Sequence, residues 1–429
     1  MKEKFKLTAL EKSWILYDVG NSAFILMVST LIPIFFNSLA ESAGVHEDLY
    51  LSYWGYAGSI ATILVAIIGP VCGAIADRNN KRTIFLISML VGVVACALLG
   101  AMSGWIAFLA MFILARVGYS ASIVFYDSML PEITPEDRID KISSLGYAYG
   151  YIGSVIPFIV CLVLVLMCDS FGLTTGSALT IAFILISVWW LGCSIPLLKK
   201  YRQTAFQAPT TTPVKDAFLQ LWGTLKAASE EKHIFLYLLS FFFFIDGVYT
   251  IIDMATAYGT ALGLDTTGLL LALLWTQFVA FPCSIIFGRL SAKYDTGLLI
   301  KVSIAAYTGI TIFGIFLVTQ WQFWVLATLV GMFQGGIQAL SRSYLGKIIP
   351  PERSGEFYGL MDIFGKGASF MGLALVSVVS QFCAGITVDV FGIRLQNENL
   401  AVGSLILLFI IGYILFCKAD ALNKARTAV

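Results

Sequence analysis

The sequence predicts an all-α integral membrane protein with twelve transmembrane helices, arranged as two pseudo-symmetric six-helix bundles with both termini in the cytoplasm. Three observations carry this prediction: the composition, the placement of Lys and Arg between long apolar stretches, and an internal repeat. The 429 residues are 59% hydrophobic and only 12% charged, with a mean hydropathy of +0.87. Soluble chains are about 25% charged, so this composition indicates lipid as the solvent.

Twelve stretches are long and apolar enough to span a bilayer as a helix, which takes about 20 residues. Gly and Pro recur inside them, as is tolerated in membrane helices. In chain order, the expected spans are 13–37, 51–75, 83–102, 105–129, 142–167, 177–198, 233–258, 267–290, 298–318, 322–345, 356–383 and 399–417.

The positions of Lys and Arg support an even number of spans and a cytoplasmic N-terminus. Of the 27 Lys and Arg residues, Arg394 alone falls on the opposite side, and Arg116 and Lys366 fall within spans. This enrichment is the positive-inside pattern. The long loop 199–232 is then cytoplasmic. Apolar residues at helical spacing predict an amphipathic helix there on the membrane surface, with a flexible linker as the alternative: Val214, Phe218, Leu221, Trp222 and Leu225.

The chain repeats itself at half its length. A shift of 215 residues aligns 130–150 with 345–365 without gaps, and the same shift places Gly73 on Gly288. We therefore expect a first six-helix bundle over 1–198, a cytoplasmic linker over 199–232 and a second bundle over 233–429. Internal repeats of this kind are typical of transporters, whose substrate site lies at the repeat interface.

Several classes of function are disfavoured by the composition and the motifs. A net charge of +1 lacks the basic field of a nucleic-acid-binding protein. The eight cysteines form no C-x-x-C motif and there are only two histidines, so a metal site or cofactor is not expected. From its charged start we expect no cleavable signal peptide, and no Walker motif for ATP is found.

The loop after the second predicted span, "GPVCGAIADRNNKR" (69–82), carries a recognisable pattern. It has a Gly, then Asp-Arg four residues on, then a basic pair: Gly73, Asp77, Arg78, Lys81 and Arg82. This pattern resembles the cytoplasmic loop motif of the major facilitator superfamily, with Asn80 where Gly is usual. The resemblance implies the major facilitator fold, with Gly73, Asp77, Arg78 and Arg82 gating the inward opening. The second copy keeps Gly288 and Lys293 but has Ala292 in place of the acid.

The stretch "YDVGNSAF" (17–24) narrows the resemblance within the superfamily. It is similar to the first-span signature of the autophagy-related vacuolar effluxer-like branch, Asp-x-Ala-Asn-Ser-Ala-Phe, with Gly20 in place of the first Ala. Yeast-type members of that branch are implicated in amino-acid export from the vacuole. The resemblance therefore implies transport of amino acids, here by a member of bacterial type.

Ionisable residues within predicted spans are functional candidates, because a charge at the bilayer centre costs at least about 2.5 kcal/mol. Asp18 and Asn21 share a face of the first span and are expected to contact substrate or a cation; a hydrogen bond to a neighbouring helix is the alternative. Arg116 resembles the fourth-span arginine motif of the family, although Tyr119 and Ser120 stand where Gln and Gly are usual. Its planar fork suits a carboxylate or phosphate, and an internal salt bridge is the alternative.

The seventh and eleventh spans carry the other mid-span charges. Asp246 and Asp253 lie seven residues apart, with Tyr249 between them, and are candidates for proton coupling. Their alternative role is a buried pairing with Lys366. Lys366 is expected either to bind an acidic group of the substrate or to pair with Asp362, four residues earlier.

Uncharged polar residues complete the predicted binding site. The family architecture implies a central cavity lined by spans one, four, seven and ten, with two, five, eight and eleven completing its wall. The charged spans all belong to these sets. Four further residues are expected to contact substrate: Tyr249, Gln277, Gln334 and Gln338.

These observations together predict a secondary transporter, not an enzyme, that works by alternating access. We expect it to move an amino acid or small peptide with protons as the coupling ion. The alternatives are an anionic metabolite, such as a sugar phosphate or cell-wall fragment, and a non-transporting membrane sensor. The expected partners are the small-molecule substrate, protons and the lipid bilayer. We expect a monomer in the bacterial inner membrane that binds no nucleic acid.

Overall fold

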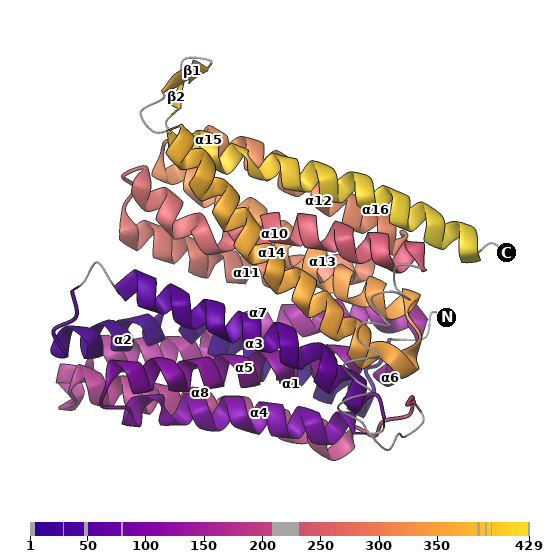
Figure 1. Ribbon diagram of the computed structural model, residues 1–429, viewed down its shortest axis with the longest axis horizontal. Coiled ribbons are helices and arrows are strands. Elements are labelled where there is room, and N and C mark those ends of the chain that lie inside the picture. Colours follow the sequence, from indigo (N-terminus) through magenta and orange to yellow (C-terminus); the bar gives the residue numbers. More distant parts are fainter. Residues whose placement is uncertain are drawn as a thin grey trace. The chain divides into compact units, whose positions relative to one another are not determined.

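The structure is a computed structural model that describes residues 5–28, 30–46, 50–78, 80–207, 231–383, 387–390, 393–395 and 397–427. Most of these residues are helical (Figure 1). The first half contains α1 (Ala9–Val28), α2 (Leu31–Ser42), α3 (Tyr50–Ala76), α4 (Lys81–Leu98), α5 (Trp105–Ser128), α6 (Leu130–Ile133), α7 (Glu136–Leu166) and α8 (Thr175–Lys200). The second half contains α10 (Lys232–Ala261), α11 (Thr266–Leu290), α12 (Thr296–Ile315), α13 (Gln320–Ile348), α14 (Ser354–Phe382), α15 (Asn397–Gly403) and α16 (Leu405–Thr427).

The prediction of an α-helical integral membrane protein is confirmed. Within the described residues, 11 helical segments are long and apolar enough to cross a membrane. Helix α14 has 29 residues, but the side chains of 366–370 lie outside the described part of the chain. The twelfth span and the cytoplasmic termini therefore stay predictions.

Two local features differ from the sequence-based expectation. The first span consists of two helices, because α1 ends at Val28 and α2 begins at Leu31. Pro33, in the first turn of α2, cannot continue a helix through the preceding turn. A hairpin of β1 (Val388–Val390) and β2 (Ile393–Leu395) lies in the loop expected between the last two spans. The predicted amphipathic helix around 214–225 falls outside the described residues.

The chain forms two compact units, and each includes a short segment from the other half of the sequence. Unit 1 comprises Met1–Pro135, Tyr149–Leu221 and Pro350–Gly359; unit 2 comprises Glu136–Ala148, Trp222–Ile349 and Leu360–Val429. We call 136–148 and 350–359 the exchanged segments. Both lie within the aligned repeat of 130–150 and 345–365. The start of α7 therefore belongs to unit 2, and the start of α14 belongs to unit 1. The predicted domain boundaries at 198 and 232 stay a prediction.

In unit 1, α4 packs against α5 and α8, while α1 packs against α8 and α3 against α5. Aromatic residues fix α1 to α5. The ring of Trp14 stacks on Tyr126 with 4.3 Å between centroids, and its Nε1 donates to the Tyr126 carbonyl at 3.0 Å. The Tyr17 hydroxyl donates to Ser122 Oγ at 2.7 Å. These buried contacts orient the face of α1 that carries Asp18.

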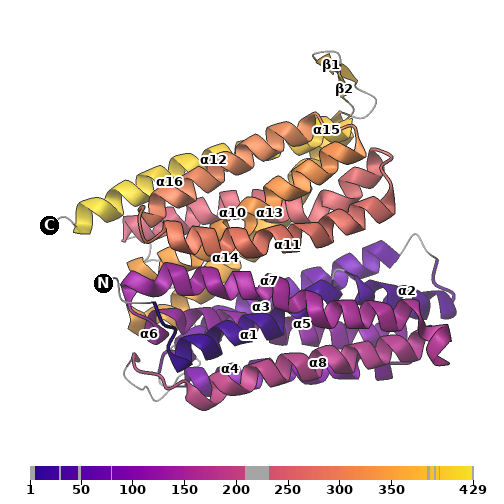
Figure 2. The same ribbon diagram turned by 180° about the vertical axis from the view of Figure 1, so that it is seen from behind.

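In unit 2, α10 packs against α16, α11 against α13, and α12 against both α13 and α16 (Figure 2). The absence of a side chain at Gly412 allows α16 to approach α10, where Ser240 Oγ donates to the Gly412 carbonyl at 2.8 Å. The Tyr258 hydroxyl joins α10 to α12 by donating to the Gly314 carbonyl at 2.8 Å. These contacts fix α10 against α16 and α12, and two of its polar residues, Asp246 and Thr250, are buried.

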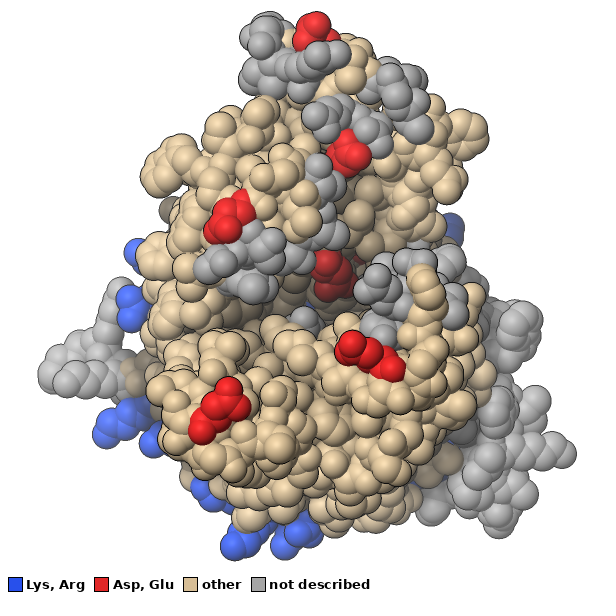
Figure 3. Space-filling model, turned by 90° about the vertical axis from the view of Figure 1, so that its left-hand side faces the viewer, with Lys and Arg blue, Asp and Glu red and all other residues tan. Residues whose placement is uncertain are grey.

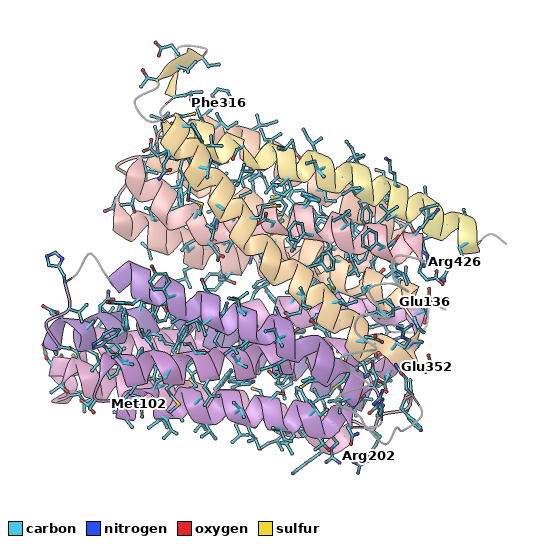
Figure 4. All side chains as sticks on the ribbon, viewed as in Figure 1. Met102, Glu136, Arg202, Phe316, Glu352 and Arg426 are labelled. Atoms are coloured by element: carbon cyan, nitrogen blue, oxygen red, sulfur yellow. The ribbon has the colours of Figure 1, made fainter. Side chains whose placement is uncertain are left out.

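Figures 3 and 4 show where some of the charged side chains lie. In unit 1, Arg202 and Glu352 lie at one end and Met102 at the other (Figure 4). In unit 2, Glu136 and Arg426 lie at one end and Phe316 at the other. The face in Figure 3 displays acidic side chains, with Lys and Arg at its outline only. A face with few Lys and Arg agrees with the positive-inside topology, which stays a prediction.

Candidate functional site

The first group of polar residues joins the loop after α3 to the start of α14, within unit 1. The side chain of Asp77 is fully buried. Its Oδ1 accepts the N–H of Gly355 at 2.9 Å and its Oδ2 accepts the N–H of Glu356 at 3.0 Å. The first N–H groups of a helix have no partner within the helix and carry partial positive charge. The Asp77 carboxylate therefore caps α14, and we call this arrangement the unit 1 clamp.

Lys81 supplies the positive charge of the unit 1 clamp. Its Nζ lies 2.6 Å from Glu132 Oε1 and 3.4 Å from Asp77 Oδ1, and it donates to Ser354 Oγ at 2.9 Å. These charges are fully or almost fully buried, and a buried charge is stable only with such partners. Burial raises the pKa of the Asp77 carboxyl, while Lys81 and the two N–H groups oppose the rise.

The other predicted gating residues, Gly73, Arg78 and Arg82, differ in their burial and in their contact with the unit 1 clamp. A Cβ at Gly73 would lie 2.8 Å from the Gly355 carbonyl carbon, so only glycine allows α3 to approach the start of α14. Arg78 is half-buried, and Arg82 is exposed. The buried cation of the loop is therefore Lys81, which the sequence pattern includes in its basic pair.

A corresponding clamp in unit 2 uses different chemistry. Asp140, in the exchanged start of α7, accepts hydrogen bonds from Lys347 Nζ at 2.6 Å and Thr296 Oγ1 at 2.5 Å. Arg342 donates through Nε to Ser143 Oγ and through Nη2 to the Ser143 carbonyl, both at 2.9 Å. The 215-residue shift relates Thr296 to Lys81 and Lys347 to Glu132. In unit 1, Lys81 and its acidic partners Asp77 and Glu132 lie outside the exchanged segment. In unit 2, the acid Asp140 lies within the exchanged segment.

The mid-span candidates of unit 1 lie on α1 and α5. Asp18 and Asn21 are buried, and Asn21 Nδ2 donates to the Tyr17 carbonyl at 2.9 Å and approaches Asp18 Oδ1 at 3.4 Å. Arg116 is half-buried. Within the described residues, no hydrogen bond or ion pair joins the Arg116 guanidinium to another side chain. An internal salt bridge, the alternative role of Arg116, is not seen among these residues.

Asp246 is the buried mid-span acid of unit 2, and only one of its two carboxylate oxygens has a hydrogen-bond partner among the described residues. The residue has 0% exposure. Its Oδ1 accepts the N–H of Gly372 at 2.9 Å and the hydroxyl of Thr250 at 3.3 Å, whereas Oδ2 is buried without a partner among the described residues. A Cβ at Gly372 would lie 2.6 Å from Asp246 Oδ1, so glycine allows α14 to reach the carboxyl group.

The remaining candidates divide between the interior of unit 2 and its surface. Asp253 is exposed, whereas Asp246 is buried. Tyr249 and Gln338 are half-buried. Gln277 and Gln334 line one pocket of unit 2. The side chain of Lys366 lies outside the described part of the chain.

Sequence reasoning missed the roles of Lys81, Glu132 and Asp140. Glu132 and Asp140 lie near a loop that was predicted to be cytoplasmic, where charges are usually solvated. The loop motif includes Lys81 but does not indicate that its side chain is buried. It also missed that the start of the linker joins the unit 1 clamp. Glu132 Oε2 accepts the N–H of Thr204 at 2.8 Å, and the N–H of Gln207 donates to the Asp77 carbonyl at 2.7 Å.

Comparison with known proteins identifies the family. The family model described as "Vacuole effluxer Atg22 like" matches residues 9–428. The chain belongs to the Atg22-like vacuole effluxer family. It is 37% identical to the MFS-type transporter YxiO of Bacillus subtilis over 416 residues, which covers 96% of this chain and 94% of YxiO. Autophagy-related protein 22 of Coccidioides immitis is 26% identical and is covered over 68% of its length.

Solved structures show the same fold at low sequence identity. The human organic anion transporter MFSD10 superposes with a TM-score of 0.71 at 12% identity, covering 95% of this chain and 98% of MFSD10. The Major Facilitator Superfamily transporter FucP superposes with a TM-score of 0.69 at 12% identity, covering 96% of this chain and 97% of FucP. The resemblance predicted from the two motifs is therefore confirmed, and this Atg22-like protein has the major facilitator fold.

Proposed function

We propose that this Atg22-like protein is a secondary active transporter that moves a small polar solute by alternating access, with protons as the coupling ion. An amino acid or small peptide is the favoured solute. The family, its MFS-type relatives and the fold support transport. The word "effluxer" in the family description favours export, and the Bacillus relative favours a bacterial plasma membrane.

The observation that carries the coupling proposal is the unpartnered oxygen of Asp246. Both donors that reach this carboxyl group, Gly372 N–H and Thr250 Oγ1, bind the same oxygen. The buried Oδ2 is therefore available to bind a proton or a cation. Carboxyl groups buried in membrane spans are typical of proton relays in transporters. Because Asp246 contacts the backbone of α14, its protonation would also change the hold on that helix.

Substitution of Asp246 tests this proposal. Asp246→Asn removes the titrating group and keeps the shape of the side chain. We expect the variant to lose uptake driven by a proton gradient but to retain counterflow exchange of labelled solute in proteoliposomes. Equal loss of both activities would show that Asp246 is needed for the transport cycle itself, and the coupling role would then be rejected.

We also propose that the unit 1 clamp is a gate. Asp77 and Lys81 hold the first turn of α14, and Gly73 allows the close approach. The clamp consists of hydrogen bonds and ion pairs that can break without unfolding a helix. A gate requires such a contact, because it must open in every transport cycle.

An anionic solute is the second candidate, favoured by Arg116. A half-buried guanidinium without a described partner can bind a carboxylate or phosphate through two parallel hydrogen bonds. The human protein MFSD10, which has the same fold, is an organic anion transporter, and this agrees with such chemistry. Arg116→Lys keeps the charge but loses the fork, so we expect affinity for an anionic solute to fall about tenfold, the effect of one strong hydrogen bond. Unchanged affinity would exclude this role.

A thermal-shift screen distinguishes the two solute classes before any transport assay. A ligand that binds only the folded state raises the melting temperature. We would screen amino acids, dipeptides, sugar phosphates and muropeptides at two pH values. Stabilisation by amino acids or dipeptides would support the favoured solute, whereas stabilisation by phosphates alone would support the anionic alternative.

A further inference from the structure

A pocket lies wholly inside unit 2, lined by residues of α10, α11, α12 and α13 and by one residue each of α15 and α16. Its cavity volume is about 80 Å³, and the pocket is partly open to the surface. Its walls are mainly aliphatic and aromatic: Met254, Leu273, Ile310, Phe323, Leu326 and Val330. No Lys, Arg, Asp or Glu is among the described residues that line it. A charged group would therefore enter it without a counter-ion, at a large cost.

Most polar groups of the pocket wall already have partners within the protein. The hydroxyls of Thr276 and Thr311 donate to carbonyls of their own helices at 3.0 and 2.8 Å. The Tyr258 hydroxyl donates to a carbonyl of α12 at 2.8 Å, and Thr250 donates to Asp246 at 3.3 Å. These groups need nothing from a ligand.

The amides of Gln277 and Gln334 are different. Neither makes a hydrogen bond to another described residue, although Gln334 has only 6% exposure. Neither amide is among the fully buried polar atoms that lack a partner, so both keep contact with the space of the pocket and can bond to a ligand there. A primary amide offers both donors and acceptors, so two amides suit a neutral group that also donates and accepts.

We propose that this pocket binds an uncharged amphipathic group: an alkyl or aromatic body that carries a neutral amide or hydroxyl. The body fills the apolar walls, and the neutral group bonds to Gln334 and Gln277. The inference deepens the proposed function, on which it rests, by naming the chemistry that unit 2 holds. Its test measures binding without any gradient, so it can fail while transport itself is confirmed.

The test uses the full chain in lipid nanodiscs and three photoreactive phenyl-diazirine probes. The probes share one body and end in a primary amide, a carboxylate or an ammonium group. After illumination and proteolysis, mass spectrometry locates the labelled residues. We expect saturable labelling by the amide probe within 250–258, 273–277 and 323–334, and at least tenfold less by either charged probe.

Three variants sharpen the result. Gln334→Leu keeps the volume and removes the amide, so the amide probe should bind about fivefold more weakly, as for one neutral hydrogen bond. Gln381→Leu removes an exposed amide of α14 and should change nothing. Ala327→Phe fills the pocket and should abolish labelling. Equal labelling by the amide and carboxylate probes, labelling only elsewhere, or full affinity in Gln334→Leu would each overturn the proposal. The Gln334→Leu result stands even if Ala327→Phe fails to fold.

Discussion

Asp77→Asn should release the first turn of α14 from the rest of unit 1. In the native protein the carboxylate accepts two N–H bonds, from Gly355 at 2.9 Å and from Glu356 at 3.0 Å, and it lies 3.4 Å from Lys81. An asparagine offers one acceptor oxygen, and its NH₂ group would face the other N–H. The variant therefore loses at least one buried hydrogen bond to a charged group.

The size of the effect follows from that lost bond. A hydrogen bond to a charged group contributes about 1.5–3 kcal/mol, and the lost interaction with the positive end of α14 adds a few tenths or more. We expect the clamped state to lose about 2–3 kcal/mol. Since 1.4 kcal/mol is a factor of ten, the open fraction of the clamp should rise roughly 30- to 150-fold.

Hydrogen–deuterium exchange measures this fraction directly, because the N–H groups of Gly355 and Glu356 are the ones that Asp77 protects. Peptides that cover 350–361 should exchange faster in Asp77→Asn by this factor. Glu352→Gln is the matched control, since Glu352 is an exposed acid in the same segment. Unchanged exchange in Asp77→Asn, or equal acceleration in both variants, would refute the capping role of Asp77.

Two further predictions concern unit 2. Gly372→Ala places a Cβ 2.6 Å from Asp246 Oδ1, so it should push α14 away and lower the melting temperature by several degrees; Gly309→Ala, in α12 with nothing within 4 Å, is the control and should be neutral or slightly stabilising. If the two variants melt alike, the close approach of α14 is not needed. Asp140→Ala leaves the Lys347 ammonium without its acid and should destabilise the protein by about 3 kcal/mol. In a double-mutant cycle, the double variant with Lys347→Ala should lose less stability than the sum of the two single variants. Strictly additive losses would show that Asp140 and Lys347 do not interact.

The helical architecture was predictable because its cause is distributed along the whole chain. Long apolar stretches and the sorting of Lys and Arg depend on many residues, so local exceptions such as Pro33 shift one boundary and leave the fold intact. The hairpin at Val388–Leu395 was not predictable, because strands of three residues leave almost no periodic signal. The exchanged segments were visible in the 215-residue repeat, although the repeat did not say which unit they join.

The candidate site was predictable only in part. Asp246 and Arg116 were found because a charge within an apolar span is costly and therefore conspicuous. The buried roles of Lys81 and Glu132 were missed because Lys81 contacts Ser354, at the start of α14 and more than 200 residues away in the sequence, and Glu132 pairs with Lys81. The unpartnered amides of Gln277 and Gln334 could not be foreseen either. Whether an amide is satisfied depends on tertiary contacts that no local pattern contains.

Solute-driven proton movement tests the central claim most directly. Proteoliposomes would contain the wild-type protein and an internal pH-sensitive dye, with equal pH on both sides. The solute that stabilises the protein most in the thermal-shift screen would then be added outside. Proton-coupled transport predicts a change of internal pH that saturates with solute and disappears in Asp246→Asn. Entry of labelled solute with no change of internal pH would contradict proton coupling, and no entry of any stabilising solute would contradict transport itself.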